Sequence, residues 1–166
     1  MSTNAAIAIK EKGGYSVIYN HWDGYPEYVG TLLHAHYRSE VKVRRLIDLG
    51  NISSLRERVE PRKGDIHTFD KPLDDVTVAY ARDRGEEKQI FRTKDLSNIP
   101  FGEFLYVYIP GKREWETYAK QGYDNEGKSK WKLLTLDYDK QIKDWILKGY
   151  FSILPRGYDS KTGERK

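Results

Sequence analysis

Two apolar segments in the second half of the chain are joined by a short turn, and this arrangement constrains the fold more than any other feature. The first segment is Phe104–Ile109 (FLYVYI), and the second lies at residues 115–118. Pro110 and Gly111 stand between them and favour a reversal of the chain. Strand-like segments with such a connection are typical of an antiparallel hairpin.

Three further segments have strand-like patterns. Residues 15–19 alternate between the two sides of an extended chain, after the turn residues Gly13 and Gly14. Residues 76–81 (VTVAYA) form an apolar run, and residues 131–136 complete the set. These patterns predict three additional strands.

Apolar residues at helical spacing predict three helices. The first covers residues 26–37, the second runs from a Ser39 cap to Gly50, and the third covers residues 137–148. Residues 53–59 indicate a further short helix. The helices therefore gather in the first third of the chain and near its C-terminus.

The order of these elements predicts an α+β fold. Strands follow one another instead of alternating with helices, which is typical of a mostly antiparallel sheet with helices packed on one face. A polar loop follows Gln121, so residues 1–120 are expected to form the core domain. Residues 121–166 then form a C-terminal helical extension of loop, strand, helix and polar tail, either separate or within the same domain. Residues 122–130 and 157–166 are polar, and we expect them to be mobile, with a frayed tail.

The composition narrows the chemistry. The 166 residues include no cysteine, which excludes disulfides and thiolate metal sites and fits an intracellular setting. No apolar run reaches the length of a membrane span. A net charge of +4 is compatible with an anionic partner. The 13 tyrosines and 4 tryptophans supply anchors for a small core or for an interface.

The segment NHWDGYP at residues 20–26 contains a possible catalytic pair. His21 and Asp23 are two residues apart, so in an extended segment their side chains point to the same side. A hydrogen bond between them would fix the imidazole tautomer that a general base requires.

The same segment also fits a structural turn, which we favour. In this interpretation Asp23 and Gly24 form the turn, and Asp23 caps the helix that begins at Pro26. We then expect the Asp23 carboxylate to accept a backbone N–H from residues 25–27. We also expect Trp22 to cover the end of the helix and to be at least half buried.

The segment ARDRGEE at residues 81–87 follows an apolar run and supports three interpretations. Arg82 and Arg84 suit the binding of an anion such as phosphate, with Asp83 orienting one of them. Asp83 and Glu86 suit carboxylate chemistry. A solvated, salt-bridged hairpin end is the commonest role for such a segment. Because residues 15–19 and 76–81 are expected to pair as strands, the two charged segments that follow them are expected to lie close together.

A basic stretch runs through the helical part of the chain. Its members are Lys42, Arg44, Arg45, Arg56, Arg58, Arg62 and Lys63. Acidic residues interrupt it, so a solvated helix face is its expected role, although basic residues near aromatic ones also suit nucleic acid.

Recognised catalytic and metal-binding motifs are absent from the sequence. There is no glycine-rich phosphate loop and no nucleophile elbow. His21, His36 and His67 do not have a spacing typical of metal ligands, so no metal and no cofactor is predicted.

In several motifs the chain resembles a family of small proteins from phages and prophages. The shared features are HWDGYP after an apolar strand, a LIDLGNISSL-like segment, HTFDKP and VTVAYARDRGE, with a weaker continuation through FLYVYIPGKREW. They follow in order from about residue 15 to residue 86. The resemblance implies a phage origin, the host cytoplasm as location and an accessory role. It transfers no activity to particular residues.

These observations favour a non-enzymatic binder or inhibitor that acts in host takeover or counter-defence. Its partner is expected to be a host protein or an anionic nucleotide or nucleic acid, and no membrane is expected to take part. The expected ligand-binding residues are Trp22, Tyr25, Arg82 and Arg84. The alternative is a small enzyme that acts on a nucleotide or nucleic acid through His21, Asp23, Asp83 and Glu86.

Overall fold

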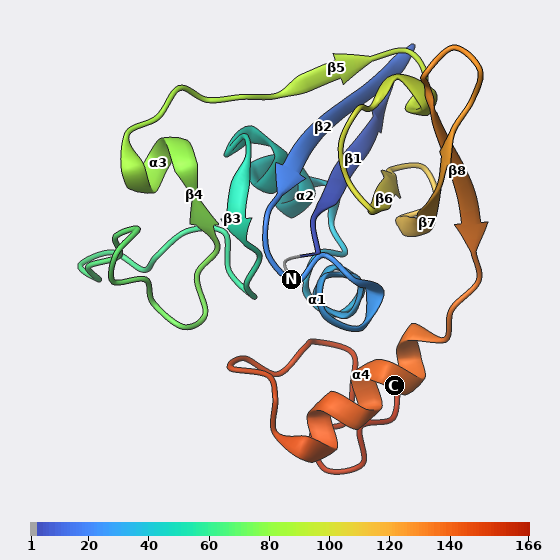
Figure 1. Cartoon of the computed structure of the whole chain (residues 1–166). Coiled ribbons are helices and arrows are strands. Elements are labelled where there is room, and N and C mark those ends of the chain that lie inside the picture. Colours follow the sequence, from blue (N-terminus) through green and yellow to red (C-terminus); the bar gives the residue numbers. More distant parts are fainter. Residues whose placement is uncertain (1–2) are drawn as a thin grey trace.

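The sheet is organised around β1 (Ala5–Glu11), a strand that the sequence patterns did not predict (Figure 1). In the computed structural model, which describes residues 3–166, β1 pairs antiparallel with β2 (Gly14–Asn20) and parallel with β6 (Phe104–Ile109). The first five residues of β1 are buried because the sheet is covered on both faces. Such a strand shows a continuous apolar run instead of alternation, so its period cannot reveal it.

Eight strands form the sheet, in the order β4-β3-β2-β1-β6-β7-β8, with β5 also paired to β2. The remaining strands are β3 (Ile52–Ser54), β4 (Val78–Ala79), β5 (Phe91–Thr93), β7 (Glu114–Tyr123) and β8 (Ser129–Leu134). Only the β1–β6 and β2–β3 pairs of these strands are parallel. The predicted α+β fold with a mostly antiparallel sheet is therefore confirmed.

Helical segments connect and flank these strands. They are η1 (Pro26–Gly30), α1 (Thr31–His36), α2 (Glu40–Asp48), α3 (Tyr80–Arg84), η2 (Leu96–Asn98) and α4 (Tyr138–Lys148). The predicted cap of α2 is confirmed, since the Ser39 Oγ accepts the N–H of Lys42 at 3.2 Å. Gly50 follows α2 with a φ of +75°, the left-handed conformation that suits a helix end.

Residues 53–59 do not form the predicted helix. Ile52, Leu55 and Val59 are buried at a spacing that imitates a helix, but the backbone is extended. Arg58 donates its N–H to a carbonyl of the neighbouring segment 75–77 and accepts an N–H from it, at 2.8 and 2.9 Å. Pairing with another segment therefore replaces local helical bonding.

The predicted strand at residues 76–81 is also shorter than expected. Only Val78–Ala79 are strand, and the chain then turns into α3. Gly85 ends α3 in the left-handed conformation, with a φ of +74°. The segment ARDRGEE therefore contains most of a short helix and its cap, and it is not a hairpin end.

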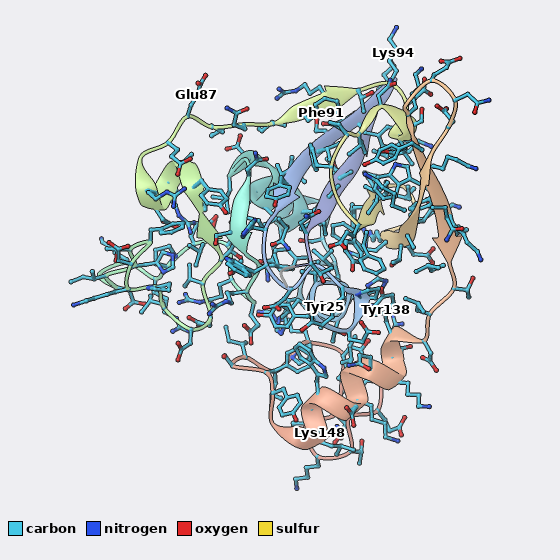
Figure 2. All side chains as sticks on the ribbon, in the orientation of Figure 1. Tyr25, Glu87, Phe91, Lys94, Tyr138 and Lys148 are labelled. Carbon is cyan, nitrogen blue, oxygen red and sulfur yellow. The ribbon has the colours of Figure 1, made fainter. Side chains whose placement is uncertain are left out.

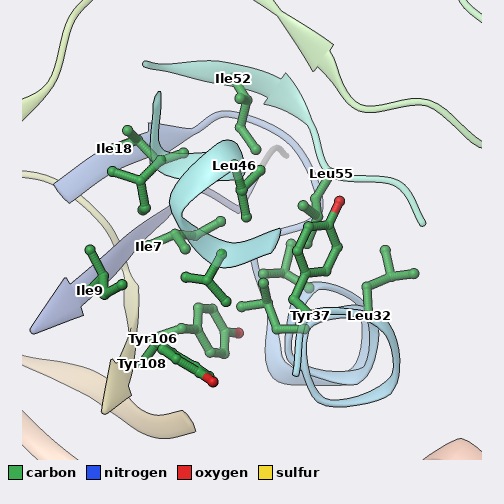
Figure 3. Close-up of a cluster of buried hydrophobic side chains, with 14 of the residues drawn as sticks. Ile7, Ile9, Ile18, Leu32, Tyr37, Leu46, Ile52, Leu55, Tyr106 and Tyr108 are labelled. Atoms are coloured by element: carbon green, nitrogen blue, oxygen red, sulfur yellow. The ribbon is translucent and has the colours of Figure 1, made fainter. Parts of the chain in front are cut away.

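Apolar clusters lie on both faces of the sheet. On one face, Ile7, Ile9 and Ile18 pack with the buried residues of α1 and α2 (Figure 3). On the other face, Ala8 packs in a cluster with Ile99, which follows η2. The predicted packing of helices on one face is confirmed for α1 and α2.

The C-terminal segment continues the sheet and then packs on α1. Strand β7 crosses position 121 and pairs with β8. Helix α4 buries Ile142 and Ile146 in a small cluster with Ala35 of α1. The division of the chain into residues 1–120 and 121–166 stays a prediction. No helix within residues 3–166 has the length and apolar character needed to cross a membrane.

The polar tail, which was expected to fray, contains an anchored turn. Tyr158 is buried and forms a β-bridge with Arg165. The Asp159 carboxylate accepts the N–H groups of Lys161 and Thr162 at 2.8 and 2.9 Å. A buried tyrosine and a side-chain-stabilised turn therefore hold a segment whose composition alone resembles a loose end.

Candidate functional site

The first residues of the HWDGYP segment extend the sheet. The N–H of His21 donates to the Ile52 carbonyl at 3.1 Å, and the N–H of Trp22 donates to the Ser53 carbonyl at 3.0 Å. This pairing fixes the backbone and leaves the Trp22 side chain at the surface, 47% exposed. The expectation that Trp22 is at least half buried is confirmed by a small margin.

Gly24 provides close packing at the centre of the turn. A Cβ at this position would lie 2.7 Å from the backbone carbonyl carbon of Asn4. The Gly24 carbonyl also accepts the hydroxyl of Tyr106 at 2.6 Å. The turn is therefore locked to the central strands, and only a residue without a side chain fits there.

The predicted Asp23 cap is wrong. The residue that precedes η1 is Tyr25, and no side chain caps this segment. Pro26 occupies the first position and has no N–H, so the need for a cap is reduced. Asp23 instead adopts the left-handed conformation, with a φ of +54°, which aspartate tolerates better than most residues.

His21 does not pair with Asp23. Its Nδ1 lies 2.8 Å from the hydroxyl of Tyr19, and its ring packs edge-on against Trp22 at a centroid distance of 4.6 Å. No hydrogen bond to Asp23 occurs in the described structure. The tyrosine, and not a carboxylate, orients this imidazole.

Asp83 has a structural role at the start of α3. Its side chain is 3% exposed and accepts the N–H of Ala79 at 2.8 Å and the Nε–H of Arg82 at 2.8 Å. Burial alone would raise the pKa of Asp83, but these two hydrogen bonds outweigh it and lower the pKa below its usual value. Asp83 therefore stays ionised and fully engaged.

His67 completes this group, which the sequence did not reveal. Its Nδ1 accepts the N–H of Leu73 at 2.9 Å, so the proton of the neutral ring is on Nε2, 3.2 Å from the Asp83 carboxylate. The His67 side chain is 1% exposed. Because both ring nitrogens are occupied and buried, this histidine and carboxylate pair tie a loop to α3 and have no lone pair free for a substrate.

The two arginines of this segment are also bound by the protein itself. Arg82 donates to the carbonyls of Val59 and Thr77 at 2.6 and 2.5 Å, in addition to Asp83. Arg84 forms an ion pair with Glu86 and lies over two aromatic rings, those of Phe69 and Tyr80, at 4.3 and 4.9 Å from their centroids. An anion at either arginine would have to compete with these partners.

The predicted joint site is not assembled. The strands at residues 15–19 and 76–81 do not pair, because β3 lies between β2 and β4. In Figure 2, Tyr25 and Glu87, from the two charged segments, lie well apart. Among the described residues, no hydrogen bond or ion pair joins residues 21–25 to residues 82–86. Residues 3–166 hold no group of three or more His, Asp or Glu side chains arranged to bind a metal ion.

A different set of residues forms a cavity with a strongly basic lining. The cavity has a volume of about 540 Å³ and lies where the end of α1 meets the start of α2. We call it the basic cavity, after its cationic lining residues Arg38, Lys42, Arg58, Arg62 and Arg156. Arg58 is neutralised, since its Nε donates to Asp75 at 2.9 Å. Within residues 3–166, the other four form no ion pair.

Local structure explains how these charges converge. The chain turns sharply between α1 and α2, so Arg38 and Lys42 stand on either side of the Ser39 cap. Arg62 comes from the loop that follows residues 53–59. Arg156 comes from residues 150–156, which follow α4 and which we call the C-terminal strap. The N-terminus of α2 also lines the cavity and adds the positive end of its dipole.

Lys42 is a partly buried member of the four unpaired cations. Its Nζ donates to the Glu57 carbonyl at 2.7 Å and lies 4.4 Å from the centroid of the Tyr37 ring. Burial, and then the nearby charge of Arg45, lower the pKa of Lys42 to about 8. Lys42 is therefore positively charged at neutral pH, although burial disfavours this charge. A bound anion would stabilise it.

His36 supplies a neutral polar group to the same cavity. Its Nε2 is buried without a hydrogen-bond partner, and its ring packs edge-on against Phe151 at 5.3 Å. Burial, and then the charge of Lys42, lower the pKa of His36 to about 4, so the ring is neutral at pH 7. His36 therefore lines the cavity without adding a charge to it.

Among the described residues, Glu57 is the one acidic residue that lines the basic cavity. It is 5% exposed, and its carboxylate accepts the N–H of Ser152 at 2.6 Å and that of Ile153 at 3.4 Å. The strap thus covers this charge with two backbone donors. The sequence interpretation of Lys42, Arg58 and Arg62 as a solvated face missed the cavity, because Arg38 and Arg156 belong to other segments.

Comparisons with protein-family models, with curated proteins and with solved structures found no match to this chain.

Proposed function

We propose that the protein is a non-enzymatic binder that captures a phosphate-bearing ligand in the basic cavity. The observation that carries this proposal is the convergence of four unpaired cations on one cavity: Arg38, Lys42, Arg62 and Arg156. Arginine presents a planar set of donors that matches phosphate, and lysine supplies a compact positive charge. The Glu57 carboxylate offsets only part of this positive charge, so an anion that binds there relieves repulsion as well as forming hydrogen bonds.

The possible catalytic groups already form hydrogen bonds within the protein, and this supports binding over catalysis. Asp83 and His67 are buried and saturated by each other and by backbone groups. His21 bonds to Tyr19, and Asp23 lies beyond its reach for a hydrogen bond. The resemblance to phage accessory proteins adds a setting for this proposal, in which the protein sequesters an anionic ligand during host takeover or counter-defence.

Calorimetry with inorganic pyrophosphate tests the proposal. The Arg62→Ala/Arg156→Ala variant removes two exposed cations from the cavity, and we expect its affinity for pyrophosphate to fall at least about hundredfold, roughly tenfold for each lost charged hydrogen bond. The matched control is Lys130→Ala/Lys132→Ala, which removes the same charge from exposed positions of β8, outside the basic cavity. Equal affinities in the two variants would show that only net charge matters and would refute a built site.

A second candidate function, contact with a host protein, is favoured by the surface of the HWDGYP turn. Trp22 and Tyr25 are 47% and 37% exposed, and such aromatic residues often anchor interfaces. A pull-down from host lysate with the intact protein and with Trp22→Ala/Tyr25→Ala tests this candidate. A partner lost only with these substitutions would place the main function at the turn.

A further inference from the structure

We infer that the phosphate-bearing ligand is a nucleotide, and that its base lies in a second cavity on the other side of the C-terminal strap. This inference rests on the proposed function of the basic cavity. The second cavity has a volume of about 340 Å³. We call it the aromatic cavity, after its lining residues Tyr28, Trp145 and Tyr150.

The aromatic residues of this cavity form a connected surface. Trp145 lies at its centre, with ring centroids 5.7 Å from Tyr28 and 6.1 Å from Tyr150. Tyr150 is 61% exposed, and the flexible Lys148 side chain is the cation that lies over its ring, with Nζ 5.8 Å from the centroid. Every nucleobase has a π-face that stacks on such rings, and this recognition depends little on the identity of the base.

Polar groups at the edge of the cavity suit the rim of a base or a ribose. Arg56 lines the cavity, and its guanidinium donates to the Asp74 carbonyl at 2.9 Å. Ser152 also lines the cavity, with an exposed side chain. A flat ring with polar edges therefore fits this lining better than an aliphatic chain does.

The two cavities are direct neighbours. Glu57 lines both of them. Ser152 belongs to the aromatic cavity and the next residue, Ile153, belongs to the basic cavity, and the N–H groups of both donate to the Glu57 carboxylate. A ligand that crosses the strap at this point would place an aromatic ring on one side and an anionic group on the other, which is the chemistry of a nucleotide.

The test compares nucleotides with the same molecule lacking its base. Binding of AMP, GMP, CMP, UMP and ribose 5-phosphate to the intact protein is measured by calorimetry. We expect at least one nucleotide to bind roughly five- to hundredfold more tightly than ribose 5-phosphate, the range that stacking of one base contributes. Tyr150→Ala should remove this advantage without weakening the binding of ribose 5-phosphate. The matched control is Tyr123→Ala, since Tyr123 is 59% exposed on β7, and it should change neither affinity.

The outcomes separate this inference from the proposed function. If ribose 5-phosphate binds as tightly as every nucleotide, or if Tyr150→Ala leaves the nucleotide advantage intact, the base subsite is refuted and phosphate capture stands. If neither nucleotides nor ribose 5-phosphate bind, and pyrophosphate does not bind either, the proposed function fails and the nucleotide assignment fails with it.

Discussion

Lys42 shows how one residue links the architecture of the basic cavity to a measurable property. Its ammonium group lies between the Glu57 carbonyl and the face of Tyr37, and burial lowers its pKa to about 8. A bound anion favours the protonated amine and must raise this pKa. The affinity for a phosphate ligand is therefore full below about pH 8 and falls as the pH rises towards the pKa of the bound state.

We predict that the affinity for ribose 5-phosphate falls about tenfold between pH 7 and pH 9.5, as the Lys42 charge is lost. The phosphate itself remains a dianion over this range, since its second pKa is about 6. Lys42→Arg keeps a positive charge at every pH in the range, so its affinity should stay constant in calorimetric titrations. An identical pH profile in the wild-type protein and in this variant would show that another group titrates.

At the same scale, single residues of the HWDGYP segment explain why a catalytic motif and a turn look alike in sequence. Close packing requires Gly24, and Pro26 suits the first position of η1. Trp22, Asp23 and Tyr25 are left at the surface. The dense composition of the segment thus combines residues that form the turn with residues that the turn displays, and the sequence does not separate the two groups.

At the scale of elements, the C-terminal strap is held beside the two cavities by the buried Glu57 carboxylate together with the packing of Phe151. Glu57→Gln keeps the size of the side chain but weakens its hydrogen bonds to the Ser152 and Ile153 N–H groups. We predict that this substitution lowers the free energy of unfolding by roughly 1–3 kcal/mol, because hydrogen bonds to a charged acceptor are replaced by weaker ones to a neutral acceptor. The same substitution should strengthen anion binding, since it removes the Glu57 negative charge from the lining of the basic cavity.

Thermal unfolding and calorimetry with pyrophosphate measure the two effects on the same sample. A variant that is less stable but binds the anion more tightly supports this role of Glu57. A variant with unchanged stability and weaker binding would contradict it, because the carboxylate would then act on the ligand through a different interaction.

Elements also differ in how far the sequence predicts them. Strand β6 leads into a recognised turn, and helices α2 and α4 have apolar residues at helical spacing. The structure confirms all three elements. Strand β1 escaped prediction because both of its faces are covered and its apolar residues do not alternate. Residues 53–59 were mistaken for a helix because their buried positions have helical spacing while their backbone pairs with residues 75–77.

At the scale of the whole molecule, the candidate site is a product of tertiary structure. Arg38 and Lys42 come from the corner between two helices, Arg62 from a loop and Arg156 from the strap after α4. No short stretch of the sequence contains all four cations. Acidic residues lie between them, so each stretch by itself resembles a solvated surface. The net charge predicts an anionic partner, and this stays a prediction, whereas the expected binding residues Arg82 and Arg84 are held by contacts within the protein.

The central claim is that the basic cavity captures a phosphate-bearing ligand without altering it. The most direct measurement is mass spectrometry of the ligand that the protein releases on denaturation, after incubation with an extract of cellular nucleotides and removal of unbound material. We predict about one equivalent of a chemically intact, phosphate-bearing molecule per protein, and none from the Arg62→Ala/Arg156→Ala variant. Recovery of an altered product in excess over the protein, lost on His21→Ala substitution, would contradict the claim and identify an enzyme.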